Sequence, residues 1–180
     1  HLADIYGGGN VGIINGTSYV EINGGVSNNI YGGGHQAGVN NTIIDLLGGE
    51  SNTVYGGSNE SGDVETTTIN VQNGVVGDIF GGNNQGGTCN ETHIEIYGGN
   101  VTGAIYGGGN GVISNPSIAE LTGETNINIA TSLENNIYGG GNYATTNETN
   151  VYLKSGTTTG NIYGGGKNAQ ATTTHVYIQG

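Results

Sequence analysis

The 180 residues of this chain include 39 glycines, one proline and no tryptophan, and 14 acidic against 2 basic side chains give a formal charge of -12. So few cations exclude nucleic acid, an anionic membrane surface and polyuronates as partners, because binding repeated negative charges requires clustered Lys and Arg. No apolar run approaches the ~20 residues that cross a bilayer, so no membrane insertion is expected, and the lone Cys89 excludes an internal disulfide.

A motif related to Ile-Tyr-Gly-Gly-Gly recurs along the whole chain. Its aromatic residue returns at intervals of 25, 24, 25, 26, 32 and 25 residues. The seven positions are Tyr6, Tyr31, Tyr55, Phe80, Tyr106, Tyr138 and Tyr163. A period in this range indicates stacked supersecondary units. It is too short for the blades of a β-propeller, which need about 40 residues each.

Each repeat contains a first strand signal in which Thr alternates with aliphatic residues, as in Thr92-Ile94-Ile96. Alternation with period two, built from β-branched residues, is typical of a half-buried strand, so these three positions are expected to face inward. The Thr position is held by Ser18, Thr42, Thr67, Thr92, Thr125, Thr149 and Thr174. Inward hydroxyls need partners, which neighbouring Thr residues or carbonyl groups at the corners can supply.

A glycine or asparagine corner follows each of these strands, as at Gly48-Gly49, and a second, short strand centres on the Ile-Tyr pair. Two residues before the aliphatic residue of that pair stands Gly or Asn in six of the seven copies. These residues are Asn28, Asn52, Gly77, Gly103, Asn135 and Gly160. Both residue types tolerate the left-handed backbone region, which predicts a sharp corner there. The glycine run after the aromatic residue is expected to turn the chain again.

No stretch carries a helical apolar period with caps. The predicted fold is therefore all-β, a single parallel β-solenoid (β-helix) over residues 1–180, with about seven coils of ~25 residues that stack at about 4.8 Å. Because the chain opens inside a repeat and stops at Gly180 after a strand, we expect a segment of a longer protein. The 32-residue interval predicts a loop insertion at 111–122, around the only proline, Pro116, either on a binding face or as a tolerated surface loop.

The seven aromatic residues are the candidate functional ladder. If the preceding aliphatic residue points inward, alternation directs each ring outward, where flanking glycines leave its face open. Such a row could stack on sugar rings or pack against a partner. Alternatively, the rings stack only on one another and cover glycine backbone, which Phe80 favours because it lacks the hydroxyl.

Other chemistry has little support in the sequence. His93 and Glu95 share a strand face, but two ligands are too few for a metal site. Cys89 lacks a neighbouring cation that would lower the pKa of its thiol. The glycine runs lack the Lys-Ser/Thr ending of a P-loop and differ from calcium-binding nonapeptides, and no paired carboxylates recur in register. No enzyme activity, cofactor or metal is expected.

The phrase Asn-Ile-Tyr-Gly-Gly-Gly, with an intervening Thr-x-Val-x-Ile strand and a Gly-Gly corner, resembles glycine-rich repeat regions of very large bacterial and archaeal cell-surface adhesin-like proteins. The resemblance covers essentially all 180 residues, although the interval around Pro116 departs from the repeat. It implies a secreted, cell-anchored solenoid stalk or adhesive fibre at the cell surface. It brings no catalytic or ligand residues.

The predicted function is a structural or adhesive element outside the cell, which displays side-chain ladders multivalently so that weak contacts add. Glycans or proteins of host or cell surfaces are the expected partners, and unpaired strand edges could support end-to-end self-association. The alternative is a carbohydrate-binding module that uses the tyrosine row. Ice binding is less favoured, because the regular Thr row has inward parity and the outward positions are mixed.

Overall fold

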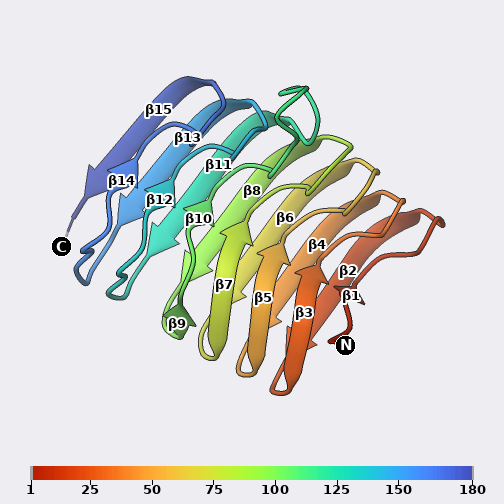
Figure 1. Cartoon of the computed structure of the whole chain (residues 1–180), viewed down its shortest axis with the longest axis horizontal. Coiled ribbons are helices and arrows are strands. Elements are labelled where there is room, and N and C mark those ends of the chain that lie inside the picture. Colours follow the sequence, from red (N-terminus) through yellow and green to blue (C-terminus); the bar gives the residue numbers. More distant parts are fainter. Residues whose placement is uncertain (1, 180) are drawn as a thin grey trace.

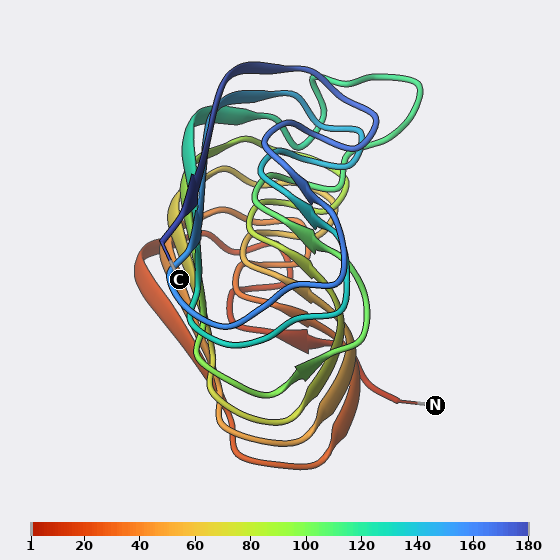
Figure 2. The same cartoon turned by 90° about the vertical axis from the view of Figure 1, so that its left-hand side faces the viewer.

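The computed structural model describes residues 2–179, which form strands, turns and loops. The chain winds into coils that stack along one axis, with successive strands running parallel (Figure 1). Seen along the stack, each coil has a long side, a shorter opposite side and an indented connection between them (Figure 2). The predicted all-β parallel β-solenoid of about seven coils is confirmed. The terminal positions 1 and 180 of the expected array lie outside the described residues.

The Thr-rich segments form one seven-stranded parallel sheet, here called the long sheet, in the order β15-β13-β11-β8-β6-β4-β2. Its strands are β2 (Ile14–Ile22), β4 (Val39–Leu46), β6 (Val64–Val71), β8 (Cys89–Ile96), β11 (Leu121–Ile129), β13 (Thr146–Leu153) and β15 (Ala171–Ile178). The register places equivalent residues side by side, so that Thr92 pairs with Thr67 in one neighbouring strand and with Thr125 in the other.

The Ile-Tyr segments form the second parallel sheet, here called the short sheet, in the order β1-β3-β5-β7-β10-β12-β14, with β9 beside β7. Its strands are β1 (Ile5–Tyr6), β3 (Val26–Tyr31), β5 (Glu50–Tyr55), β7 (Val75–Phe80), β9 (Asn100–Val101), β10 (Ile105–Tyr106), β12 (Ile137–Tyr138) and β14 (Ile162–Tyr163). The later strands are shorter. One extra residue precedes Ile105 and Ile162, and the corner before Ile137 has no glycine.

Five of the corners that follow the long strands contain a glycine with left-handed backbone, as at Gly49 with a φ of 81°; the corner after β11 contains none. The sequence predicts left-handed backbone elsewhere in the coil, two residues before the aliphatic residue of the short strand, and that prediction is wrong. Among the described residues only Ala119 is a non-glycine with positive φ, and Gly77 is not in that region either. Glycine stands there because of the neighbouring coil: a Cβ on Gly77 would lie 2.0 Å from the carbonyl oxygen of Asn52.

Rows of aliphatic side chains from both sheets meet between them and form the core. Fully buried members include Ile44, Ile69, Ile94, Ile127 and Val151 from the long sheet and Ile30, Val54, Ile79 and Ile137 from the short sheet. Burying one such side chain contributes roughly 1.5–3 kcal/mol. Because every coil adds the same two or more side chains, the core is a continuous column.

The Thr row faces inward as predicted, and its hydroxyls bond to corner carbonyls. Thr67 and Thr92 are fully buried, and their Oγ1 atoms donate to the carbonyl oxygens of Gly81 and Gly107, both at 2.7 Å. A Cβ on Gly81 would lie 2.1 Å from the Gly107 oxygen and 2.9 Å from the Cβ of Thr92. The first glycine of each run is therefore required by this close approach. At the last coil Thr174 is exposed.

The residues expected to form the insertion leave the stack between β10 and β11, where Figure 1 shows a loop projecting from one corner. The last two, Leu121 and Thr122, already belong to β11. The loop is attached to the next coil, because the backbone N–H of Thr145 donates to the carbonyl oxygen of Pro116 at 2.9 Å. Ala119 has a φ of 59° and is fully buried at the foot of the loop.

Candidate functional site

The seven candidate aromatic rings form one unbroken stack along the short sheet. Consecutive ring centroids lie 4.5 to 5.1 Å apart, and neighbouring ring planes deviate by 2 to 9° from parallel. The strand register produces this spacing, since Tyr106 pairs directly with Phe80 on one side and with Tyr138 on the other. The sequence therefore places all seven rings in one column.

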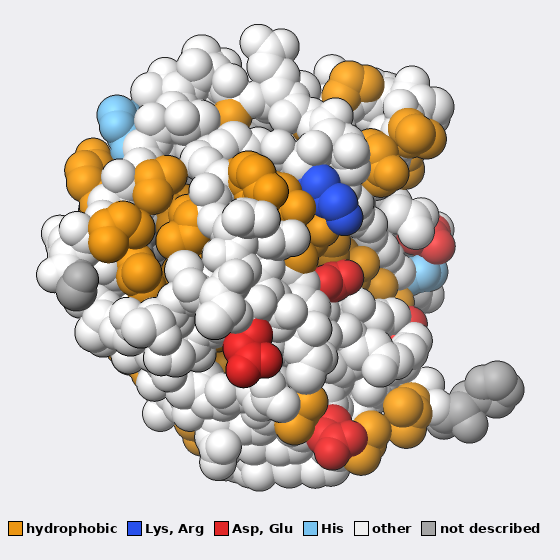
Figure 3. Space-filling model, turned by 60° about the vertical axis from the view of Figure 1, so that its left-hand side comes forward, with side chains coloured by type: hydrophobic (Ala, Val, Ile, Leu, Met, Phe, Trp, Pro, Cys, Tyr) orange, Lys and Arg blue, Asp and Glu red, His pale blue; other side chains and the backbone are white. Residues whose placement is uncertain are grey.

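The faces of the interior rings are covered, which differs from the open row considered above. Tyr31 and Tyr106 are each 3% exposed and Phe80 is 4% exposed, whereas Tyr163, in the last coil, is 44% exposed. Each interior ring has a neighbouring ring against both faces, so a sugar ring cannot stack there. On the side of the molecule in Figure 3, apolar side chains (orange) form groups between backbone and other side chains (white).

A ladder of asparagine side chains runs beside the ring column. Each amide Nδ2 donates to the Oδ1 of the residue one coil earlier, at 2.8 to 3.0 Å. The members are Asn59, Asn84, Asn110, Asn142 and Asn168. The amide of Asn59 also donates to the hydroxyl of Tyr6 at 3.1 Å. This ladder is not among the sites predicted from the sequence, although Asn follows the glycine run in several repeats with the same period.

The tyrosine hydroxyls have little acid-base reactivity. Burial raises the pKa of Tyr55 to about 12, and it also raises the pKa values of Tyr31 and Tyr106. The ammonium of Lys167 lies 3.3 Å from the hydroxyl of Tyr106 and donates to it. These phenols therefore stay protonated at neutral pH and serve neither as bases nor as nucleophiles.

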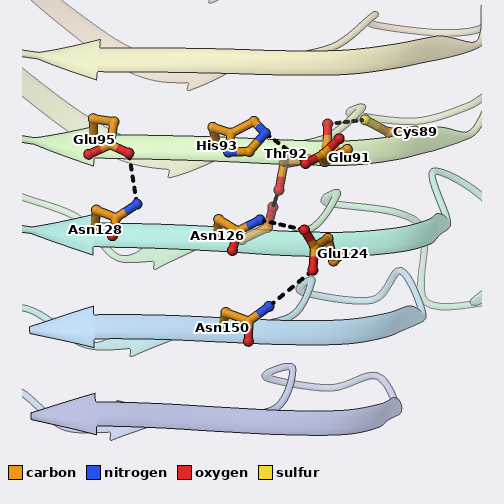
Figure 4. A network of polar contacts seen from close by, with 10 residues as sticks. Cys89, Glu91, Thr92, His93, Glu95, Glu124, Asn126, Asn128 and Asn150 are labelled. Atoms are coloured by element: carbon orange, nitrogen blue, oxygen red, sulfur yellow. Dashed lines mark hydrogen bonds and ion pairs between the residues drawn. The ribbon is translucent and has the colours of Figure 1, made fainter.

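On the outward side of the middle strands of the long sheet, polar side chains bond to one another (Figure 4), whereas Tyr152 and Tyr177 stack farther along it. Glu124 accepts hydrogen bonds from the amides of Asn126 and Asn150 at 3.2 and 3.4 Å. The ring of His93 lies 3.0 Å from the carboxylate of Glu91, the residue before Thr92 in the strand. The structure therefore pairs His93 with Glu91, and the carboxylate of Glu95 instead accepts from the next strand.

Cys89 occupies an inward position and is fully buried between Val64 and Leu121 of the adjacent coils. Burial raises the pKa of its thiol to about 12. The thiolate is the reactive form of cysteine, so this side chain acts as a small apolar filler. Within residues 2–179 no group of three or more His, Cys, Asp or Glu side chains is arranged to hold a metal ion. The same residues contain no helix that could span a bilayer.

Comparison of this chain with protein-family models, with curated proteins and with solved structures finds no match. Its function is therefore inferred from its own residues and geometry.

Proposed function

We propose that this chain is a structural and adhesive segment of an extracellular surface protein, in which a rod presents repeated side chains for attachment. The observation that supports it is the register of the seven long strands. The register shifts near the start of β2, before Thr17, and of β11, before Glu124. Beyond these points equivalent residues lie beside one another from β2 to β15, so each outward position there is repeated once per coil. A repeated surface of this kind suits many weak contacts that add through avidity.

Three ladders inside and beside the core support a stiff rod. Stacked aromatic rings, Thr hydroxyls bonded to glycine carbonyls and paired asparagine amides each link one coil to its neighbours or close the coil on itself. The backbone pairing of a coil is with the coils before and after it, and the side chains of Asn59 and Lys167 reach two coils back to Tyr6 and Tyr106. The resistance of the rod to bending therefore comes from many similar interfaces.

The composition supports a role in attachment outside the cell. A surface with 14 acidic and 2 basic side chains keeps a β-rich rod soluble. The polar groups on the outward side of the long sheet bond to one another in its middle strands and stay at the surface, where a partner can contact them.

An adhesion measurement under flow tests the proposal. Beads that carry the purified chain are passed over layers of epithelial cells, layers of bacterial cells and a blank of albumin. At least tenfold more beads should be retained on one of the cell layers than on albumin. Beads that carry the unfolded variant Ile94→Asp should show no such preference. Equal retention on all surfaces, together with light scattering that shows no assembly of the chain, would contradict the proposal.

The carbohydrate-binding alternative based on the ring column lacks a favourable geometry in the interior coils. Tyr31, Tyr55 and Tyr106 have their faces against neighbouring rings. Replacing Tyr106 with Ala is therefore expected to lower the melting temperature. Loss of glycan binding by this variant without any change in melting would instead favour the alternative.

A further inference from the structure

A polar groove runs along the rod at the corner where the long strands begin. Two hollows meet there and share Thr122: one extends along the later coils and the other along the earlier ones. We call it the corner groove and define it by the outward residue near the start of six successive strands: Asn40, Glu65, Asn90, Thr122, Asn147 and Thr172. Because the strands are in register, these side chains follow the axis of the rod.

The insertion forms a wall of this groove. Ser117 and Glu120 of the loop line the hollow of the later coils. The hydroxyl of Thr145 donates to the carboxylate of Glu120 at 3.1 Å, and its backbone N–H donates to Pro116. The only large departure from the repeat is thus fixed beside the groove, on the coil that follows it. Insertions of repeat proteins often map to the binding face.

Three side-chain amides in the groove are available to a ligand, whereas Asp63 and Asn90 accept hydrogen bonds from Thr88 and Thr122. The amides of Asn40, Asn147 and Gln170 make no hydrogen bond to any other residue that the structure describes, and all three residues are exposed. On the outward side of the long sheet, by contrast, amides such as that of Asn128 are bonded to carboxylates. Strand backbones hold the groove residues at fixed intervals along the rod, so a ligand with a regular repeat can meet them in successive coils.

We propose that the corner groove binds an extended, neutral polysaccharide, an inference that rests on the proposed function and names the ligand class for attachment. Hydroxyl and amide side chains both donate and accept hydrogen bonds, as sugar hydroxyls do. The lining includes the carboxylates of Asp63, Glu65 and Glu120 and no Lys or Arg, which disfavours an anionic polymer.

The geometry disfavours an extended peptide as the occupant. Peptides that bind sheets use an unpaired strand edge and pockets for apolar side chains. Here the strands beside the groove, such as β8 and β11, are paired on both sides, and the lining is mainly polar. Coils recur at about 4.8 Å, close to the length of one sugar unit in an extended chain, so successive units can make equivalent contacts with successive coils.

Affinity electrophoresis of the full chain in gels that contain soluble glucan, mannan, xylan or galactan tests the proposal. At least one of these neutral polymers should retard the chain, and polygalacturonate should not. The double variant Asn147→Ala/Gln170→Ala should weaken the retardation at least tenfold in apparent affinity. The matched control Gln72→Ala/Asn73→Ala removes the same two residue types from the opposite corner, where both are exposed, and should bind like the unmodified chain.

Both variants should melt within a few degrees of the unmodified chain, so that a loss of binding reports on the groove. Absence of retardation by all four neutral polymers overturns the proposal, as does equal weakening by the control variant. Binding of polylysine but of none of the neutral polymers, weakened by Glu65→Gln/Glu120→Gln in the groove, would assign the groove to a basic protein partner and overturn the proposal as well. If the chain retains beads under flow but binds none of the polysaccharides, the groove proposal is wrong. The proposed function is then still supported.

Discussion

The two sides of the long sheet share one strand register but differ in how strictly each position keeps the same residue type from coil to coil. On the inward side Thr67, Thr92 and Thr125 repeat the same residue and the same hydrogen bond in successive coils. On the outward side the neighbouring row changes from Thr68 to His93 to Asn126. Stacking therefore acts on both sides, whereas close packing against the glycine corners constrains only the inner one.

The outward side has its own constraint, which is charge. Glu91, Glu124 and Glu148 lie in adjacent strands in register, and like charges side by side are unfavourable. Each carboxylate has a partner within reach: His93 for the first, Asn126 for the second and His175 for the third. The residues of the outer rows thus vary, but each carboxylate of this row keeps a neighbouring side chain that can donate a hydrogen bond to it.

The largest difference between the two sides should appear for adjacent residues of β8. Ile94→Asp places a carboxylate in a fully buried position without a partner and should lower the free energy of unfolding by more than about 4 kcal/mol. Glu95→Lys loses two hydrogen bonds at the surface, from Asn128 at 2.7 Å and from the hydroxyl of Tyr97 at 3.4 Å, and should change the free energy of unfolding by less than about 1 kcal/mol. Denaturant titration measures both, and similar midpoints for the two variants would break the comparison.

The next largest difference should come from replacing a glycine with alanine at a crowded inner corner and at an open position of the long sheet. Gly81→Ala brings a Cβ against the Gly107 oxygen and should destabilise the chain by about 3 kcal/mol. Gly16→Ala, in β2, adds a Cβ with nothing within 4 Å and should stay within about 0.5 kcal/mol of the unmodified chain. Thermal melting followed by circular dichroism distinguishes the pair. A harmless Gly81→Ala would show that the close approach of the corner to the Thr row is not required.

Removing a hydroxyl tests the inner hydrogen bond alone. Thr92→Val keeps the shape but leaves the Gly107 carbonyl oxygen without the Thr hydroxyl, which should destabilise the chain by about 1–2 kcal/mol. Thr68→Val, on the outward side of the adjacent strand, should have almost no effect. Equal unfolding free energies for these two valine variants would mean that the buried hydroxyl adds no net stability.

The smallest effect concerns pH and the ring column. An unfolded tyrosine ionises near its ordinary pKa of 10.0, whereas burial holds the pKa of Tyr55 at about 12. Its contribution to stability is therefore present below pH 10 and is lost as the pH rises toward 12, because unfolding then releases a proton. Tyr55→Phe should leave stability at pH 7 within about 0.5 kcal/mol and reduce the alkaline slope by about 1.4 kcal/mol per pH unit. An unchanged slope in urea titrations from pH 9 to 12 counts against this assignment.

The sequence predicts the fold well because the parity of a strand decides which side each residue faces. Once Ile94 is inward, Thr92 and Ile96 must be inward too, and the period then stacks them on their equivalents. Glycine is harder to interpret. Gly49 serves a left-handed corner and Gly81 a close approach, and the residue type alone does not separate the two uses.

The candidate site was less predictable. The spacing brings the seven aromatic residues into one column, but it does not reveal that each ring covers the faces of its neighbours. The asparagines after the glycine run, such as Asn59 and Asn84, recur with the period of the repeat, but the hydrogen bond between their amides depends on the path of the chain there, which the period does not specify. The choice of Glu91 over Glu95 by His93 likewise depends on side-chain rotamers.

The loop around Pro116 departs at one corner and rejoins the stack without shifting the pairing of β11 with β8 from Thr92 onward. This corner accepts additional sequence while the neighbouring turns keep their alignment. A foreign peptide spliced between Ile113 and Ser114, where both side chains are exposed, should be carried on a rigid scaffold at a known height along the rod. This loop is therefore a suitable insertion site for the display of foreign epitopes.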